Sequence, residues 1–194
     1  MNREHITRCL EPISNMVAWP KRRRDDGLTN AAVLMPLIER EQWHILLTTR
    51  TEHLRRHAGQ VSFPGGRADE QDKTPRQTAL RETYEEVGIK PEFIEVAGVI
   101  EPYLTVTDFH VVPIVGFVQP DVSLTIDKGE VAGVFEVPML DICDRSNYQR
   151  KKIHWQGEWR EYWEFMHQEH RIWGATAAML YSFAGRLSNV KSLL

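Results

Sequence analysis

The segment from Thr74 to Gly88 constrains the fold most, because both of its ends carry helix-boundary signals. Thr74 is a good N-cap residue, Pro75 occupies the first helical position, and Gln77 stands at the capping-box position three residues after Thr74. Gly88 stands where helices commonly end in a left-handed residue. The sequence therefore predicts one helix between these two boundaries.

The predicted helix has an apolar face and an acidic face. The apolar face is a stripe that we expect to pack on a sheet: Ala79, Leu80, Tyr84 and Val87. The acidic side chains fall outside this stripe and are expected to face a cleft or solvent: Glu82, Glu85 and Glu86. Offsets of three and four residues place these carboxylates on one turn of the helix. Arg81 can reach Glu85, four residues on, and offset part of their repulsion.

Clustered carboxylates suit a hard divalent cation, because Mg²⁺ and Mn²⁺ prefer carboxylate oxygens. The competing interpretation is a solvated acidic helix face, which is the commoner meaning of such a pattern. The residues upstream favour the metal site. Gly65 and Gly66 follow a predicted strand and permit a tight turn and an extended loop. Such a loop can bring backbone groups close to a metal ion and to phosphate oxygens.

The stretch from Gly65 to Ile89 resembles the Nudix box, G-x5-E-x7-R-E-U-x-E-E-x-G-U with U aliphatic. The matching residues are Gly66, Arg81, Glu82, Glu85, Glu86, Gly88 and Ile89. Two positions depart from the pattern. Asp72 stands where Glu is expected, with eight rather than seven residues before Arg81, and Thr83 replaces an aliphatic residue. The resemblance implies the α/β Nudix fold, an α/β/α sandwich around a mixed β-sheet, and metal-dependent diphosphate hydrolysis.

The upstream stretch from Leu46 to Gly66, LLTTRTEHLRRHAGQVSFPGG, resembles the signature of coenzyme A diphosphatases. This Nudix subgroup also carries the extra residue in the box. The resemblance implies that CoA or an acyl-CoA is cut at its diphosphate to 3′,5′-ADP and 4′-phosphopantetheine. Guanidinium groups suit phosphates by charge and fork geometry, so this segment is expected to contact substrate. The expected contacts are Arg50, Arg55, Arg56, Gly65 and Gly66, and a plain surface loop is the alternative.

The resemblance also implies roles for the acids. Glu82, Glu85 and Glu86 are expected to bind Mg²⁺ or Mn²⁺, with Arg81 orienting them. The cation would neutralise and align the diphosphate and lower the pKa of bound water, and a glutamate would take the water proton. In related enzymes an acid beyond the box often completes the metal site or acts as base. Glu130 is the candidate by position. Its competitor is Glu136.

Other functions fit parts of the same pattern. The chain could hydrolyse another nucleoside diphosphate derivative, such as ADP-ribose, or a nucleoside triphosphate. It could also be a non-catalytic nucleotide-binding Nudix domain, although the intact acidic cluster argues against a sensor. A structural protein with an accidental acidic helix would show no effect of Glu85→Gln on metal binding or turnover.

The length of 194 residues fits one domain over 1–194, with a core of about 28–187. A formal net charge of −3 gives no nucleic-acid footprint. The chain has no 18-residue apolar run and no signal-peptide pattern, so we expect no membrane segment and a cytoplasmic location. Cys9 and Cys143 are too few and too far apart for a disulfide framework or a zinc site.

The rest of the chain predicts strands and a closing helix. Apolar, β-rich runs predict strands at 31–38, 44–49, 93–100, 111–118 and 132–137. A helix is expected at 172–187, where small and large apolar residues alternate. Residues 148–173 are expected to form hairpin strands with four tryptophans: Trp155, Trp159, Trp163 and Trp173. Core packing is the expected role of these rings, with adenine stacking as the alternative. An exposed aromatic hairpin would suit a homodimer interface.

Overall fold

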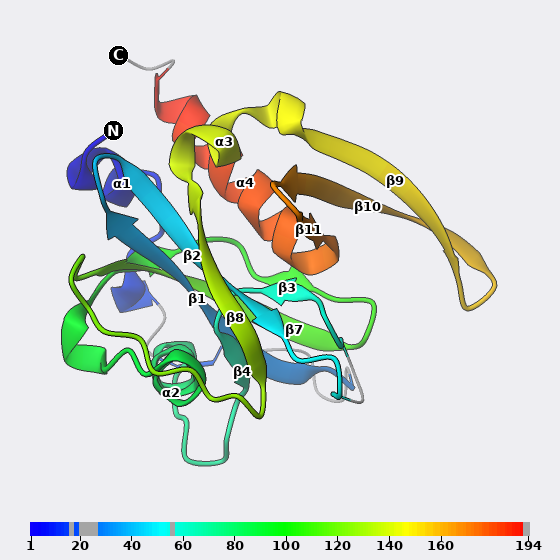
Figure 1. Cartoon of the computed structure of the whole chain (residues 1–194), viewed down its shortest axis with the longest axis horizontal. Helices are drawn as coiled ribbons and strands as arrows, with labels where there is room; N and C mark the ends of the chain where they lie inside the picture. The colour runs from blue at the N-terminus through cyan, green and yellow to red at the C-terminus, as the bar shows by residue number, and fades with distance from the viewer. Residues whose placement is uncertain (16–17, 20–26, 55–56, 192–194) are drawn as a thin grey trace.

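The computed structural model describes residues 1–15, 18–19, 27–54 and 57–191. In this part of the chain, eight strands form one mixed sheet (Figure 1). They are β1 (Thr29–Glu39), β2 (Trp43–Arg50), β3 (Val61–Ser62), β4 (Gly65–Arg67), β5 (Ile94–Val99), β6 (Tyr103–Leu104), β7 (Phe109–Val118) and β8 (Val131–Pro138). The main path of the sheet is β3-β2-β1-β7-β5, and β8 also pairs with β2. Each of the predicted strand runs is confirmed.

Strands β1 and β7 form the centre of this sheet. They pair in parallel, from Thr29 opposite Phe109 to Ile38 opposite Val118, whereas their other neighbours are antiparallel. All of β7 after its first residue is buried. A strand covered on both faces needs apolar side chains on both, and this explains its almost continuous apolar sequence.

Helices cover both faces of the sheet (Figure 1). They are α1 (Arg3–Arg8), α2 (Pro75–Val87), α3 (Met139–Cys143) and α4 (Gly174–Lys191), with 3₁₀ turns at Ile13–Asn15, Pro91–Phe93 and Arg145–Asn147. One apolar layer joins α2 to the sheet, and a second, larger layer joins the other helices to the opposite face. The predicted α/β/α sandwich is confirmed. Among the described residues, no helix is long and apolar enough to cross a bilayer.

A second sheet of three strands lies beside α4. It contains β9 (Tyr148–Trp155), β10 (Glu158–His167) and β11 (His170–Trp173), so the predicted helix at 172–187 begins two residues later than expected. Strands β9 and β10 extend past α4 as an arm (Figure 1). The prediction of core packing is wrong for Trp155 and Trp159, which are 43% and 72% exposed, because no helix or strand of the described residues covers this part of the arm (Figure 1). Trp163, closer to the body, stacks on Tyr181 of α4 with ring centroids 4.0 Å apart.

A short segment, Val61–Arg67, is inserted between β1 and β2. Its first part, β3, pairs with the end of β2, and its last part, β4, pairs with β1. Between them the carbonyl of Pro64 accepts a hydrogen bond from the N–H of Leu34 (2.9 Å). Gly65 has a φ of 151°, and a Cβ there would lie 2.5 Å from the Ala32 carbonyl oxygen, so only glycine fits. Because this segment passes from β2 to β1, its last part, β4, lies directly against α2.

Candidate active site

The predicted ends of α2 are confirmed. The Thr74 hydroxyl accepts a hydrogen bond from the Gln77 N–H (3.2 Å), and the Gln77 side chain accepts one from the Thr74 N–H (3.1 Å). Gly88 is left-handed, with a φ of 75°. The predicted apolar stripe is wrong at Tyr84, which is 50% exposed. Thr83 is buried instead and donates its hydroxyl to a backbone carbonyl one turn earlier (2.6 Å), so threonine fits where the family pattern is aliphatic.

Glu86 is the innermost acid of the site. It is only 3% exposed, which corrects the expectation that all three acids face a cleft or solvent. Its Oε2 accepts a hydrogen bond from the Gly65 N–H (3.0 Å), and Nη1 of Arg50 lies 3.6 Å from its Oε1. Burial raises the pKa of Glu86 to about 8. The Gly65 hydrogen bond and Arg50 oppose this rise, whereas the negative charges of Glu82 and Glu130 add to it.

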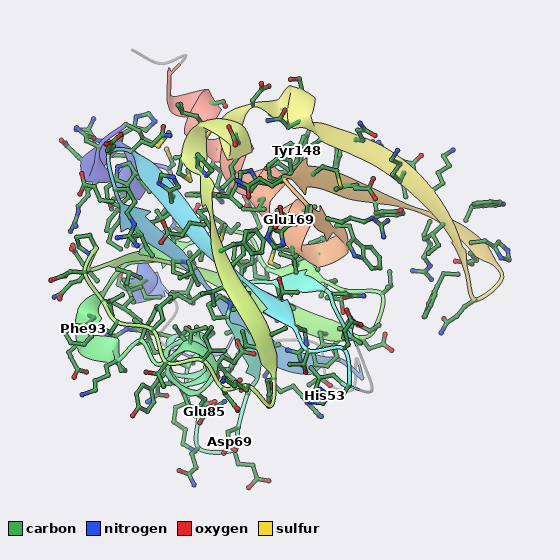
Figure 2. All side chains as sticks on the ribbon, viewed as in Figure 1. His53, Asp69, Glu85, Phe93, Tyr148 and Glu169 are labelled. Carbon is green, nitrogen blue, oxygen red and sulfur yellow. The ribbon has the colours of Figure 1, made fainter. Side chains whose placement is uncertain are left out.

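Glu82 and Glu85 lie further out and share Arg81 as a partner. The Glu82 carboxylate rests against Gly66, where an added Cβ would lie 2.6 Å from its carboxylate carbon. Burial raises the pKa of Glu82, and the Arg81 charge opposes the rise. Glu85 lies at the exposed rim of α2 (Figure 2). Its Oε2 accepts a hydrogen bond from Arg81 Nη1 (2.9 Å), as predicted.

Arg81 is held from its other side by Asp72, which sequence reasoning left without a role. Nη2 of Arg81 donates to Oδ2 of Asp72 (2.8 Å) and to the backbone carbonyl of Arg67 (3.1 Å). Asp72 also accepts hydrogen bonds from the Thr78 hydroxyl and the Asp69 N–H. Burial alone would raise the pKa of Asp72, but these hydrogen bonds hold it below its usual value. The signal was present in the sequence, because Asp72 occupies the acidic position of the box.

Of the two acids proposed beyond the box, the structure brings Glu130 to the site. Glu130 lies exposed before β8, close enough to Glu82 and Glu86 to raise the pKa of both. Glu136 lies further along β8, where its Oε1 is 2.6 Å from Nη2 of Arg40. Glu136 is therefore committed to an ion pair with the β1–β2 turn.

The segment after β2 lies against the loop that carries Glu130. The Thr51 N–H donates to the Glu130 carbonyl (2.9 Å), and the His53 ring nitrogen Nε2 lies 3.2 Å from the Gly129 carbonyl. Arg50, at the start of this segment, lies beside Glu86, and its role in substrate binding stays a prediction. The other two expected arginines, Arg55 and Arg56, lie outside the described residues.

The donor set fits a hard divalent cation. The carboxylates of Glu82, Glu86 and Glu130 share one region, and the charge of Glu130 helps to raise the pKa of both Glu82 and Glu86, a repulsion that a cation would relieve. In the described residues, however, no three acidic, histidine or cysteine side chains already converge as a metal site. Glu85 is instead paired with Arg81. The assignment of Glu82, Glu85 and Glu86 as metal ligands stays a prediction.

Comparison with known proteins agrees with this geometry. The family model described as NUDIX domain matches residues 28–156. Two bacterial proteins that share the name Uncharacterized Nudix hydrolase NudL are similar to the chain. The protein of Enterobacter sp. (strain 638) is 42% identical over 166 residues, 85% of this chain and 86% of its own length. The protein of Klebsiella pneumoniae is 43% identical over 154 residues, which cover 79% and 80% of the two chains.

Solved structures share the fold at low sequence identity. The Caenorhabditis elegans Ap4A hydrolase binary complex superimposes with a TM-score of 0.54 at 15% identity, over 86% of this chain and all of that one. A NUDIX hydrolase from Alicyclobacillus acidocaldarius gives 0.55 at 18% identity, over 86% and 96%. The family model, the bacterial relatives and the site geometry agree, and the chain therefore belongs to the Nudix hydrolase family of enzymes, which act on diphosphate bonds.

Proposed function

We propose that this protein hydrolyses the diphosphate bond of coenzyme A or its derivatives to 3′,5′-ADP and 4′-phosphopantetheine. One observation carries the proposal: the CoA-type signature and the Nudix box meet in one site. Arg50, from the signature, lies 3.6 Å from the carboxylate of Glu86, from the box. Since the Thr51 N–H also donates to the backbone carbonyl of Glu130, a phosphate bound by Arg50 would lie close to the segments that carry Glu86 and Glu130.

The residues of the site have separate tasks in this proposal. When bound, Mg²⁺ or Mn²⁺ neutralises the diphosphate and lowers the pKa of a coordinated water. Glu82, Glu85 and Glu86 would hold the cation. Arg81 orients Glu82 and Glu85 through its Nη1. Glu130, the exposed acid, is our candidate for taking the proton of the attacking water.

The proposal includes the type of partner and the compartment. CoA or an acyl-CoA is a small-molecule substrate, so the site requires neither nucleic acid nor a membrane. Cys9 and Cys143 are too few and too far apart for a disulfide framework, which is typical of proteins of a reducing compartment. We therefore assign the enzyme to the cytoplasm.

The test is hydrolysis of CoA by the purified protein with Mg²⁺ or Mn²⁺, with the products separated by chromatography. We expect 3′,5′-ADP to appear only with metal, and its formation to fall in Glu85→Gln. ADP-ribose and nucleoside triphosphates form the comparison panel. A clear preference for either would refute the CoA assignment while leaving the Nudix site intact. No turnover of any of these substrates would favour a non-catalytic nucleotide-binding domain.

A further inference from the structure

A pocket of about 430 Å³ lies between the segment that precedes β3 and strand β11. We call it the β11 pocket; its walls include Ala58, Gln60, Val61, Glu169, His170 and Trp173. Strands β3 and β11 lie next to each other in the fold, and Glu169 lies at the turn before β11 (Figures 1 and 2). The volume of the β11 pocket falls within the range of roughly 300–1,000 Å³ that small-molecule sites occupy.

The β11 pocket and the acidic site lie on opposite faces of the same strand end. Successive side chains of a strand point to opposite faces. Arg50 points to Glu86, and the preceding residue, Thr49, lines the β11 pocket. The two places are joined by a backbone hydrogen bond from Arg50 to the carbonyl of Gln60 (2.9 Å). Because Thr49 and Arg50 are successive residues, the pocket and the acidic site lie on either side of the end of β2.

The charges of the pocket select against a phosphate group. Glu52 and Glu169 contribute two carboxylates. The cation on its wall, Arg171, is already bound by other groups: its Nε donates to Glu164 (2.6 Å) and its Nη2 to the Tyr162 hydroxyl (3.0 Å). A 3′-phosphate placed here would lie near the carboxylates of Glu52 and Glu169, of which the second has Nε2 of His170 3.8 Å from its Oε1.

The same walls suit an uncharged chain that contains amides. Val61 and the Trp173 ring supply apolar surface, and the side chains of Thr49 and Gln60 supply hydrogen-bond donors and acceptors. His170 is fixed in place because its ring stacks on Phe135, with centroids 3.6 Å apart. Of the two halves of CoA, only the pantetheine arm is uncharged and contains amides.

We propose that the β11 pocket binds the pantetheine arm of the substrate, whereas the nucleotide half, with its 3′-phosphate, stays on the Arg50 side. This inference rests on the proposed CoA hydrolysis. It identifies the pantetheine arm as the half of the substrate that binds outside the acidic site.

The test fills the pocket from an exposed position. Ala58→Trp should raise the KM for CoA about tenfold, equal to about 1.4 kcal/mol, with a smaller change in kcat. It should weaken inhibition by 4′-phosphopantetheine by a similar factor and leave inhibition by 3′,5′-ADP unchanged. Trp173→Ala is the second variant, which removes a wall. Trp159→Ala, on the exposed arm, is the matched control and should keep the KM for CoA and the inhibition by both products unchanged.

The outcomes separate the pocket from the proposed function. Normal CoA cleavage with unchanged KM in Ala58→Trp would overturn the pocket assignment and leave the function standing. Weaker inhibition by 3′,5′-ADP alone would assign the pocket to the nucleotide half and overturn it too. If the protein does not cleave CoA, the proposed function is wrong. Calorimetric titration with 4′-phosphopantetheine then tests the pocket assignment by itself. Binding that Ala58→Trp abolishes would support the pocket, and no binding would overturn it.

Discussion

Arg81 positions the acids of the site, and Asp72 positions Arg81. The guanidinium group donates to Glu82 and Glu85 on one side and to Asp72 on the other. Removal of a residue that holds the groups around a metal site in place commonly lowers metal affinity or activity by about 10–100-fold. We predict that Asp72→Ala lowers kcat/KM and Mn²⁺ affinity by a factor in this range.

The control for this prediction is Asp69→Ala in the same turn. The Asp69 carboxylate accepts a hydrogen bond from the Gln71 N–H, whereas the Arg81 guanidinium binds Asp72. We expect this variant to keep its activity and its Mn²⁺ affinity. Equal losses in Asp69→Ala and Asp72→Ala would show that the turn matters only for folding.

Glu86 gives the metal-free protein a pH-dependent stability. Its pKa is about 8 in the fold, against an ordinary value of 4.5, so the folded state favours the protonated form. The contribution of Glu86 is therefore complete below pH 4.5 and is lost as pH rises towards 8. We predict that Glu86→Gln and the unmodified protein are equally stable near the acid end of this range. With a chelator at the upper end, the variant is more stable by about 2–4 kcal/mol.

Urea unfolding at a series of pH values tests this prediction. The difference in unfolding free energy between Glu86→Gln and the unmodified protein should grow with pH. Glu85→Gln is the matched control, because the Glu85 side chain is 55% exposed and hydrogen-bonded to Arg81. A constant difference across the pH range would show that Glu86 is already ionised in the metal-free fold.

At the scale of the element, β4 controls how closely α2 approaches the sheet. A Cβ at Gly66 would meet the Glu82 carboxylate at 2.6 Å, so the Glu82 side chain would have to move from its present position. We predict that Gly66→Ala lowers kcat by at least about tenfold with less than about 1 kcal/mol lost in stability. Gly133→Ala is the control, because nothing lies within 4 Å of its added Cβ. Steady-state kinetics and thermal unfolding of both variants measure these changes in kcat and stability. Full activity of Gly66→Ala would contradict the prediction.

The same elements show what sequence could and could not predict. The ends of α2 were predictable because the capping contacts of Thr74 and Gln77 lie within four residues of one another. The burial of Glu86 was not, because it depends on Gly65 in a segment 21 residues away along the chain. The insertion of β3 and β4 between β1 and β2 gives no local signal. The prediction that Tyr84 packs on the sheet was wrong because helical periodicity places a side chain on a face of the helix but does not say how far the sheet extends beneath that face.

At the scale of the molecule, the sandwich was predictable and the arm was not. Residues 148–167 have the aromatic, alternating composition of hairpin strands, and these strands are present. Composition cannot say whether a second layer covers them. In the structure α4 packs on the hairpin as far as Trp163, which stacks on Tyr181. The rings of Trp155 and Trp159 lie beyond α4 and are exposed.

The exposed arm leads to a prediction about assembly. A two-stranded ribbon is only marginally stable in water without a further layer, and this one carries a tryptophan on each face. Trp155 and Trp159 occupy opposite faces because Trp159 pairs with His154, the neighbour of Trp155. We predict that the protein forms a homodimer in which the faces of the arm are covered. Pairing through the edge of β9 is disfavoured by Arg150, Lys151 and Lys152.

Light scattering on a sizing column, over a range of protein concentrations, measures this assembly. The unmodified protein should approach the mass of a dimer as concentration rises, whereas Trp155→Ser/Trp159→Ser should remain a monomer. Both rings are on the arm and outside the acidic site, so the variant should keep its hydrolytic activity and its Tm. A monomer at every concentration would contradict the prediction. A dimer that persists in the double variant would place the interface elsewhere on the molecule, and the arm would then be an uncovered ribbon held only by its own hydrogen bonds and ion pairs.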